Sequence, residues 1–169
     1  RVEPRYAYLL VDSAAGLSRQ TVAFAAACDQ TLLVTTPDVT AMTDAYAFLK
    51  VFTRQCEALG ERRALPLLVV NRAANADEAR QVGARLQEVT RKFLDRQLEV
   101  LGWLHEDRAV FRSTQQRQSV VAGEPGSPVA QALELVATEL EERLRGEDGA
   151  GMGARLEAMS TRERTPRRA

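Results

Sequence analysis

The sequence predicts an α/β fold in which helices flank a mostly parallel sheet. Short apolar runs, at 6–11, 31–36, 65–70 and 100–104, alternate with segments whose apolar residues recur every three or four positions. That alternation is typical of parallel strands connected by helices. Polar side chains also follow directly after several of these runs, where open α/β sheets place their ligands. The 169 residues suffice for one domain with a sizeable core.

The first expected strand is 6–11, and the predicted site starts from it. Its sequence, YAYLLV, is an apolar run suited to a strand that is buried on both faces. Asp12 is the first polar side chain after it, and Gly16 allows a turn whose backbone N–H groups can approach an anion. Ser18 is placed to cap a helix over 19–28. These features favour a nucleotide site, although a lone acidic residue at a strand end can simply cap a loop.

The second strand, 31–36, leads into a long helix. Thr40 is predicted to cap this helix, which spans 41 to about 59. Asp44 lies in its expected first turn, where a negative charge is favourable. Gly60 follows its expected end, as glycine commonly does after a helix.

The third strand, 65–70, ends in Asn71 and Arg72, which again places polar groups at a carboxyl end. A long amphipathic helix is predicted over 77–98 from its steps of three and four between apolar residues. A shorter fourth strand is expected at 100–104.

The C-terminal third changes character twice. The polar, Gln-rich stretch 108–121 predicts a short helix and a turn, and a serine followed by a proline predicts a helix over 127–144. Beyond it the composition shifts to Gly, Glu, Arg, Ser and Thr. We therefore expect residues 1–145 to form the folded part and 146–169 to form a flexible Gly/Arg-rich tail.

Three strand ends, at Asp12, Thr36 and Asn71, should lie along one edge of a parallel sheet, with the loop at Glu106 beside them. That convergence is the reason to predict a site here. An isolated Asn or Asp would indicate little.

Composition excludes several classes. The 23 Lys and Arg balance the 23 Asp and Glu, so no net field attracts nucleic acid. No apolar run is long enough to span a membrane, and the start RVEPRYAY has no signal-peptide pattern. Two cysteines, Cys28 and Cys56, and a single histidine argue against a disulfide framework or a zinc site and suit a reducing cytoplasm. The chain starts without Met and almost at once enters a strand, so we expect the distal part of a longer protein.

In five stretches of its sequence the chain resembles the MinD/ParA family of deviant-Walker P-loop ATPases, and most closely its flagellar-number branch, FlhG/FleN. The matching stretches are LLVDSAAGLS (9–18), LLVTTPDVTAMTDAYAFLK (32–50), LLVVNRA (67–73), LGWLHED (101–107) and QQRQSVVAGEPGSPVAQAL (115–133). They cover most of residues 6–133 in the family's order, and the second and fifth point to the flagellar branch.

The family's defining loop has no counterpart in this sequence. No G-x-x-x-x-G-K-[ST] pattern occurs in the 169 residues. The resemblance implies that the missing strand would lie next to the strand ending at Asp12. Its absence implies that the chain has no phosphate cradle and has an open gap in its core.

The resemblance assigns roles to the residues at the predicted edge. Asp12 matches the catalytic aspartate that orients a water on Mg²⁺, and Gly16 matches the glycine whose N–H senses the γ-phosphate of ATP. Asn71 matches the residue that pairs with the adenine edge, and Arg72 could pack on the base plane. Taken alone, an Asn-Arg pair more often marks a strand-terminating turn.

Residues 104–107 match the family's loop that closes over adenine, which makes Glu106 and Asp107 candidate cofactor contacts. His105 replaces the usual proline, which puts the rigidity of that loop in doubt. His105 itself is expected to be a loop residue and not a catalytic base.

Four further residues, Pro37, Asp38, Thr43 and Asp44, resemble the family's dimer and partner face. An ordinary strand stop and helix N-terminus explain them equally well.

For the intact protein, the resemblance implies an ATP- and Mg²⁺-dependent switch ATPase that forms a homodimer and regulates flagellar number or placement. Its implied partners are a flagellar GTPase and motor-switch or polar regulator proteins, in the cytoplasm or peripherally at the membrane or cell pole. ATP hydrolysis is not expected of this chain alone, because the phosphate loop is missing. The family's amphipathic membrane helix has no clear match, since 152–169 contains no Phe, Trp or Ile; a linker is favoured over weak membrane contact.

Two alternatives stay open. The chain could be a non-catalytic fragment or binding module of the same family, which the missing phosphate loop would explain. A chromosome-partitioning relative is a weaker alternative, because the balanced charge gives no reason to expect nucleic acid as a partner.

Overall fold

The computed structural model describes residues 6–145 and Arg155. In chain order its elements are α1 (Arg19–Ala27), β1 (Leu32–Thr35), α2 (Val39–Ala58), β2 (Leu67–Ala73), α3 (Ala76–Leu94), β3 (Val100–His105), α4 (Arg108–Gln115), α5 (Val120–Gly123) and α6 (Pro128–Leu144). The described strands form one parallel sheet in the order β1-β2-β3. The predicted α/β class with a parallel sheet is confirmed.

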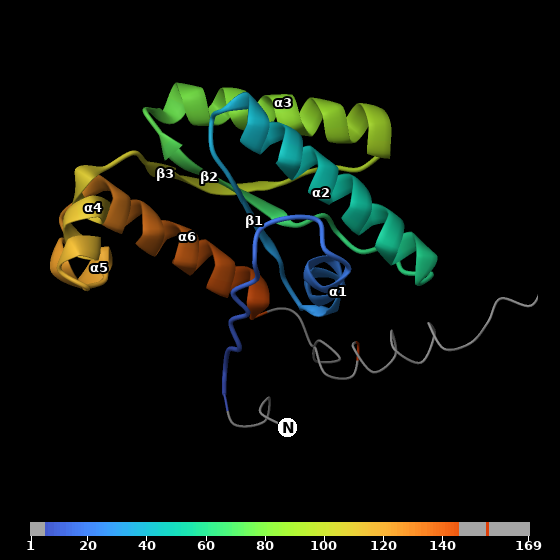
Figure 1. Ribbon diagram of the computed structural model, residues 1–169, viewed down its shortest axis with the longest axis horizontal. Coiled ribbons are helices and arrows are strands. Elements are labelled where there is room, and N and C mark those ends of the chain that lie inside the picture. The colour runs from blue at the N-terminus through green and yellow to red at the C-terminus, as the bar shows by residue number, and fades with distance from the viewer. Residues whose placement is uncertain (1–5, 146–154, 156–169) are drawn as a thin grey trace, which may run out of the picture.

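The helices cover the two faces of this sheet unequally. α2 and α3 lie side by side over one face, and α6 packs against β3 on the other (Figure 1). The core lies under α2 and α3, where Leu49, Leu68 and Val70 are completely buried. On the opposite face none of the described helices covers β1, and Val34 is 56% exposed although it lies in a strand.

Local signals placed most helix ends correctly. The Ser18 side chain accepts a hydrogen bond from the Thr21 N–H at the start of α1, and Ser127 does the same for Ala130 at the start of α6. Gly60 follows α2 with a φ of 71°, a conformation that suits glycine.

The predicted start of α2 was wrong by two residues. Asp38, and not Thr40, is the N-cap, because its carboxylate accepts the Ala41 N–H at 2.8 Å. The helix therefore begins at Val39, and Asp44 lies beyond its first turn.

The predicted end of α3 was also wrong. That helix ends at Leu94, four residues before the expected end. It ends there because Asp95 adopts a left-handed conformation that ends the helical hydrogen bonding.

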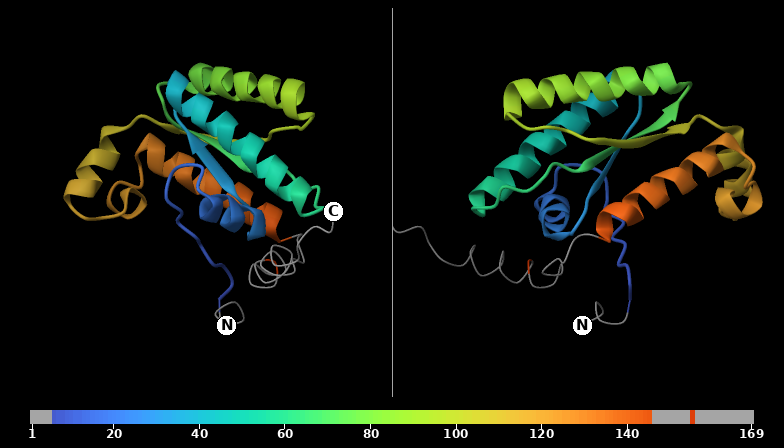
Figure 2. Two further views of the ribbon diagram at one scale, coloured as in Figure 1. Left: turned by 45° about the vertical axis from the view of Figure 1, so that its right-hand side comes forward. Right: turned by 180° about the vertical axis from the view of Figure 1, so that it is seen from behind.

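The predicted strand at 6–11 does not form. The segment has no strand conformation, its side chains are exposed, and Leu10 reaches 89%. In Figures 1 and 2 the dark-blue segment runs outside the three-stranded sheet. A strand needs a hydrogen-bonding neighbour, and β2 is the only described strand that pairs with β1. The apolar pattern of 6–11 predicted a strand, but no described strand lies beside this segment to accept and donate its backbone hydrogen bonds.

Of the predicted tail 146–169, only Arg155 lies within the described residues. Among the described helices, none is both long and apolar enough to cross a membrane.

Candidate functional site at the carboxyl ends of the strands

A β-bulge lies at the carboxyl end of β2. Val70 is in register with Trp103 and Ala73 with His105, so Asn71 and Arg72 together stand opposite a single residue of β3. Arg72 has a φ of 57°, which is uncommon for a residue with a side chain. Bulges of this kind redirect side chains and are common beside binding sites.

The bulge is tied to β3 through an ion pair. The Arg72 Nη2 donates to Glu106 Oε1 at 2.8 Å, and the Glu106 N–H donates to the Ala73 carbonyl at 3.0 Å. Glu106 raises the pKa of Arg72 above its ordinary value, mainly through this hydrogen bond. The structure therefore brings three of the predicted site residues, Asn71, Arg72 and Glu106, to one place.

Asp38 lies near the same edge. Its negative charge also contributes to the raised pKa of Arg72. The pKa of Asp38 is lowered, first because the Thr36 hydroxyl donates to its carboxylate and second because the Ala41 N–H does. Two of the three strand ends that were predicted to converge, those of β1 and β2, therefore lie near each other, whereas Asp12 follows no described strand.

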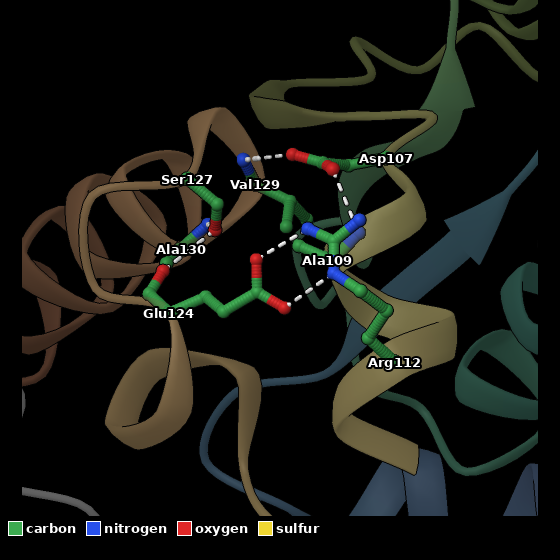
Figure 3. A network of polar contacts seen from close by, with 7 residues as sticks. All are labelled: Asp107, Ala109, Arg112, Glu124, Ser127, Val129 and Ala130. Carbon is green, nitrogen blue, oxygen red and sulfur yellow. Dashed lines mark hydrogen bonds and ion pairs between the residues drawn. The ribbon is translucent and has the colours of Figure 1, made fainter. Parts of the chain in front are cut away.

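The structure gives Asp107 a role that sequence reasoning missed. One carboxylate oxygen accepts the Ala109 N–H at 2.8 Å, at the start of α4, and the other lies 3.5 Å from the Val129 N–H, at the start of α6 (Figure 3). This carboxylate therefore caps the start of α4 and contacts the start of α6. An acidic residue one position before a helix was the available signal, but the contact with α6 could not be read from it.

An ion pair beside Asp107 was also missed. The Arg112 Nε donates to Glu124 Oε1 at 2.8 Å, and Nη2 of the same side chain reaches the second oxygen (Figure 3). The Arg112 guanidinium lowers the pKa of Glu124. This bidentate pair joins α4 to the turn before α6.

Asp12 and Gly16 are not part of this cluster. Both are exposed, and within residues 6–145 and Arg155 neither makes a hydrogen bond or ion pair to Asn71, Arg72 or Glu106. Gly16 does have a φ of 109°, so the predicted need for glycine at this turn is met.

Of the predicted dimer and partner face, Asp38, Thr43 and Asp44 are exposed and Pro37 is half-buried. These residues lie at a strand end and a helix start. That position is compatible both with a dimer and partner face and with an ordinary strand stop and helix N-terminus.

The described residues fit the base end of a nucleotide better than its phosphate end. Asn71 offers an amide with a donor and an acceptor, which suits a base edge. Asp12 is an exposed carboxylate of the kind that Mg²⁺ accepts singly. No glycine-rich phosphate loop is present in the sequence, and the described residues contain no group of three or more His, Cys, Asp or Glu that could hold a metal by themselves.

Two curated proteins are similar to the chain in sequence. It is 33% identical over 133 residues to the antiactivator FleN of Pseudomonas aeruginosa, which covers 79% of the chain and 46% of FleN. It is 31% identical over 138 residues to the flagellum site-determining protein YlxH of Helicobacter pylori, which covers 81% of the chain and 45% of YlxH. The chain therefore spans about half the length of these relatives.

Solved structures show the same fold. The cell division ATPase MinD of Pyrococcus furiosus superposes with a TM-score of 0.62 at 22% identity, covering 83% of the chain and 54% of that protein. MinD of Aquifex aeolicus gives 0.56 at 24% identity, covering 88% and 57%. No protein-family model matches the chain. The sequence relatives of the chain are therefore FleN and YlxH, and its fold is that of the MinD ATPases, in agreement with the resemblance of the sequence to the MinD/ParA family.

Proposed function

We propose that the chain is the distal part of a nucleotide-dependent switch protein that regulates flagellar number or placement. The sequence similarity to FleN, named as an antiactivator, and to YlxH, named as flagellum site-determining, supports the flagellar role. The MinD fold supports the switch. The switch would act in the cytoplasm or at its membrane periphery, through a flagellar GTPase and motor-switch or polar regulator proteins.

The observation that carries this proposal is the Asn71–Arg72 bulge with Glu106 beside it, at the carboxyl edge of the parallel sheet. That edge is where open α/β sheets bind their ligands. In our proposal the Asn71 amide meets the adenine of ATP, and the loop 104–107 closes over it. Asp12 would hold a water of Mg²⁺, and Gly16 would meet the γ-phosphate.

The phosphate grip would come from sequence outside these 169 residues. The strand before that phosphate loop would lie between the exposed segment 6–11 and the free edge of β1, which is an edge strand of the described sheet. With ATP bound, two subunits would associate through the face that includes Pro37, Asp38, Thr43 and Asp44, and hydrolysis would release them.

The test begins with the codons upstream of Arg1, which we expect to encode a KGG-x-G-K-[ST]-like run. The protein that includes them should double its mass in light scattering with Mg-ATP and stay monomeric with ADP. Asp12→Ala should abolish this doubling, whereas Asp77→Ala, an exposed acidic residue on α3, should not. A protein that stays monomeric with ATP would contradict the switch.

A second candidate is a binding module that has lost the ATPase. It is favoured by the absence of a phosphate-loop pattern in the sequence and by the position of 6–11 outside the sheet. An upstream sequence without that run would support the module and remove the switch.

A further inference from the structure

The Asn71 side chain is held by its own neighbour. Its Oδ1 accepts the Arg72 backbone N–H at 2.9 Å. Because this N–H points at the amide oxygen and not at the amide nitrogen, the contact distinguishes the two ends of the amide. The left-handed backbone of Arg72 is part of the geometry of this bulge.

We propose that Arg72 is a positioning residue that fixes the Asn71 amide for reading a purine edge, and that Glu106 is the anchor that keeps Arg72 in place. This inference rests on the proposed nucleotide site. It differs from the expectation that Arg72 packs on the base, because it assigns the Arg72 guanidinium to the ion pair with Glu106.

A fixed amide selects one kind of purine. Asn71 Oδ1 uses one acceptor position on Arg72, which leaves a second acceptor position and the two N–H donors of the amide. Adenine presents a donor amino group beside an acceptor ring nitrogen, whereas guanine presents two acceptors on the same edge. If the amide cannot rotate, its oxygen accepts from the adenine amino group and its NH₂ donates to the adjacent ring nitrogen. With guanine the same amide oxygen would face an acceptor and be repelled.

The anchor joins two loops. Arg72 belongs to the end of β2, and Glu106 follows β3, where its own N–H is bonded to the Ala73 carbonyl. The ion pair therefore connects the residue that holds Asn71 to the loop expected to close over the base. The Arg72 and Glu106 side chains are 65% and 59% exposed, so the pair contributes little to folding. Its loss should weaken adenosine binding about threefold to fivefold.

The experiment uses the protein that includes the upstream sequence, as in the light-scattering test above. It is titrated with adenosine and with guanosine and followed by ¹⁵N NMR, which detects millimolar affinities. The Asn71 side-chain amide and the Arg72 and Glu106 backbone signals are the reporters. Arg72→Ala and Glu106→Gln are the test variants. Arg117→Ala is the matched control, because Arg117 is also an arginine with positive φ, of 53°, and lies in the turn after α4.

Wild type should bind adenosine more tightly than guanosine. Both test variants should lose about threefold to fivefold in adenosine affinity and most of the preference, while the control keeps both. The exchanged pair Arg72→Glu with Glu106→Arg should recover part of the loss. In the free protein, ¹⁵N relaxation of the Asn71 amide should show greater motion in both test variants than in the control.

The outcomes separate the two proposals. If wild type prefers adenosine and the test variants behave like the control, the positioning role is wrong and the nucleotide site stands. If wild type binds neither nucleoside, the base site of the proposed function is wrong, and the positioning role is wrong with it.

Discussion

The Asp107 carboxylate and the Val129 N–H join the β3–α4 loop to α6 across 22 positions of sequence, with Oδ2 of Asp107 3.5 Å from the Val129 nitrogen. The other oxygen of the same carboxylate accepts the Ala109 N–H. The first N–H groups of a helix have no partner within the helix, so one side chain supplies acceptors to two helices at once.

Asp107→Ala should therefore cost more than the loss of a single cap. A single N-cap contributes about 1 kcal/mol, and we expect about 1.5–3 kcal/mol for Asp107 by chemical denaturation. Asn75→Ala, which removes the cap of α3 alone, is the comparison. Equal losses would show that the Val129 contact contributes nothing.

Gly102 brings β3 and α6 close together. A Cβ on Gly102 would lie 2.7 Å from Cγ2 of Val136, so Gly102→Ala should destabilise the protein by about 1–3 kcal/mol through overpacking. Adding Val136→Ala should recover part of that loss, because it removes the clashing methyl. Gly126→Ala, which meets nothing within 4 Å, serves as control. A Gly102→Ala variant as stable as this control would contradict the close packing.

β1 lies at the edge of the described sheet and carries an exposed apolar side chain, Val34. Because exposed apolar edge strands recruit other chains, the chain by itself should aggregate. Val34→Lys should slow aggregation measured by light scattering. The same charge placed on α6 as Leu135→Lys, at another exposed apolar position, should slow it less. Identical effects would indicate that general charge, and not the strand edge, controls solubility.

The pair between Glu99 and Arg143 should make stability depend on pH. Arg143 Nη2 lies 2.7 Å from Glu99 Oε1 and lowers the pKa of that carboxyl below its ordinary value of 4.5. A lowered acid pKa contributes stability that is present above pH 4.5 and is lost as pH falls through the folded-state pKa. Glu99 is largely exposed, so the contribution is well under about 1 kcal/mol.

Urea unfolding of Glu99→Gln against wild type across pH 3 to 7 measures this contribution. The two proteins should differ at neutral pH and converge at the acid end. A difference that stays constant with pH would exclude the ion pair as its source.

The helices were largely predictable because their signals are local. Ser18 and Ser127 act on N–H groups three residues away, and the apolar spacing of α2 and α3 decides which side of each helix faces the core. Asp38 took the place of Thr40 because two candidates two positions apart competed for one helix start, and the carboxylate of Asp38 also gained a hydrogen bond from the Thr36 hydroxyl.

The site was only partly predictable. The sequence indicated that Asn71 and Arg72 follow a strand and that Glu106 follows another. It did not indicate that a bulge would turn Arg72 toward Glu106, because register irregularities depend on how two strands that are distant in sequence fit together.

By itself, the sequence determined the α/β class, the helices and most of their ends, since these follow from contacts between residues a few positions apart. The tertiary structure alone decided that 6–11 would not be a strand, that Asp107 would cap two helices, and that Arg72 would pair with Glu106. Each of these depends on groups brought together from distant parts of the chain, and an apolar run without a neighbouring strand has no partner for its backbone hydrogen bonds.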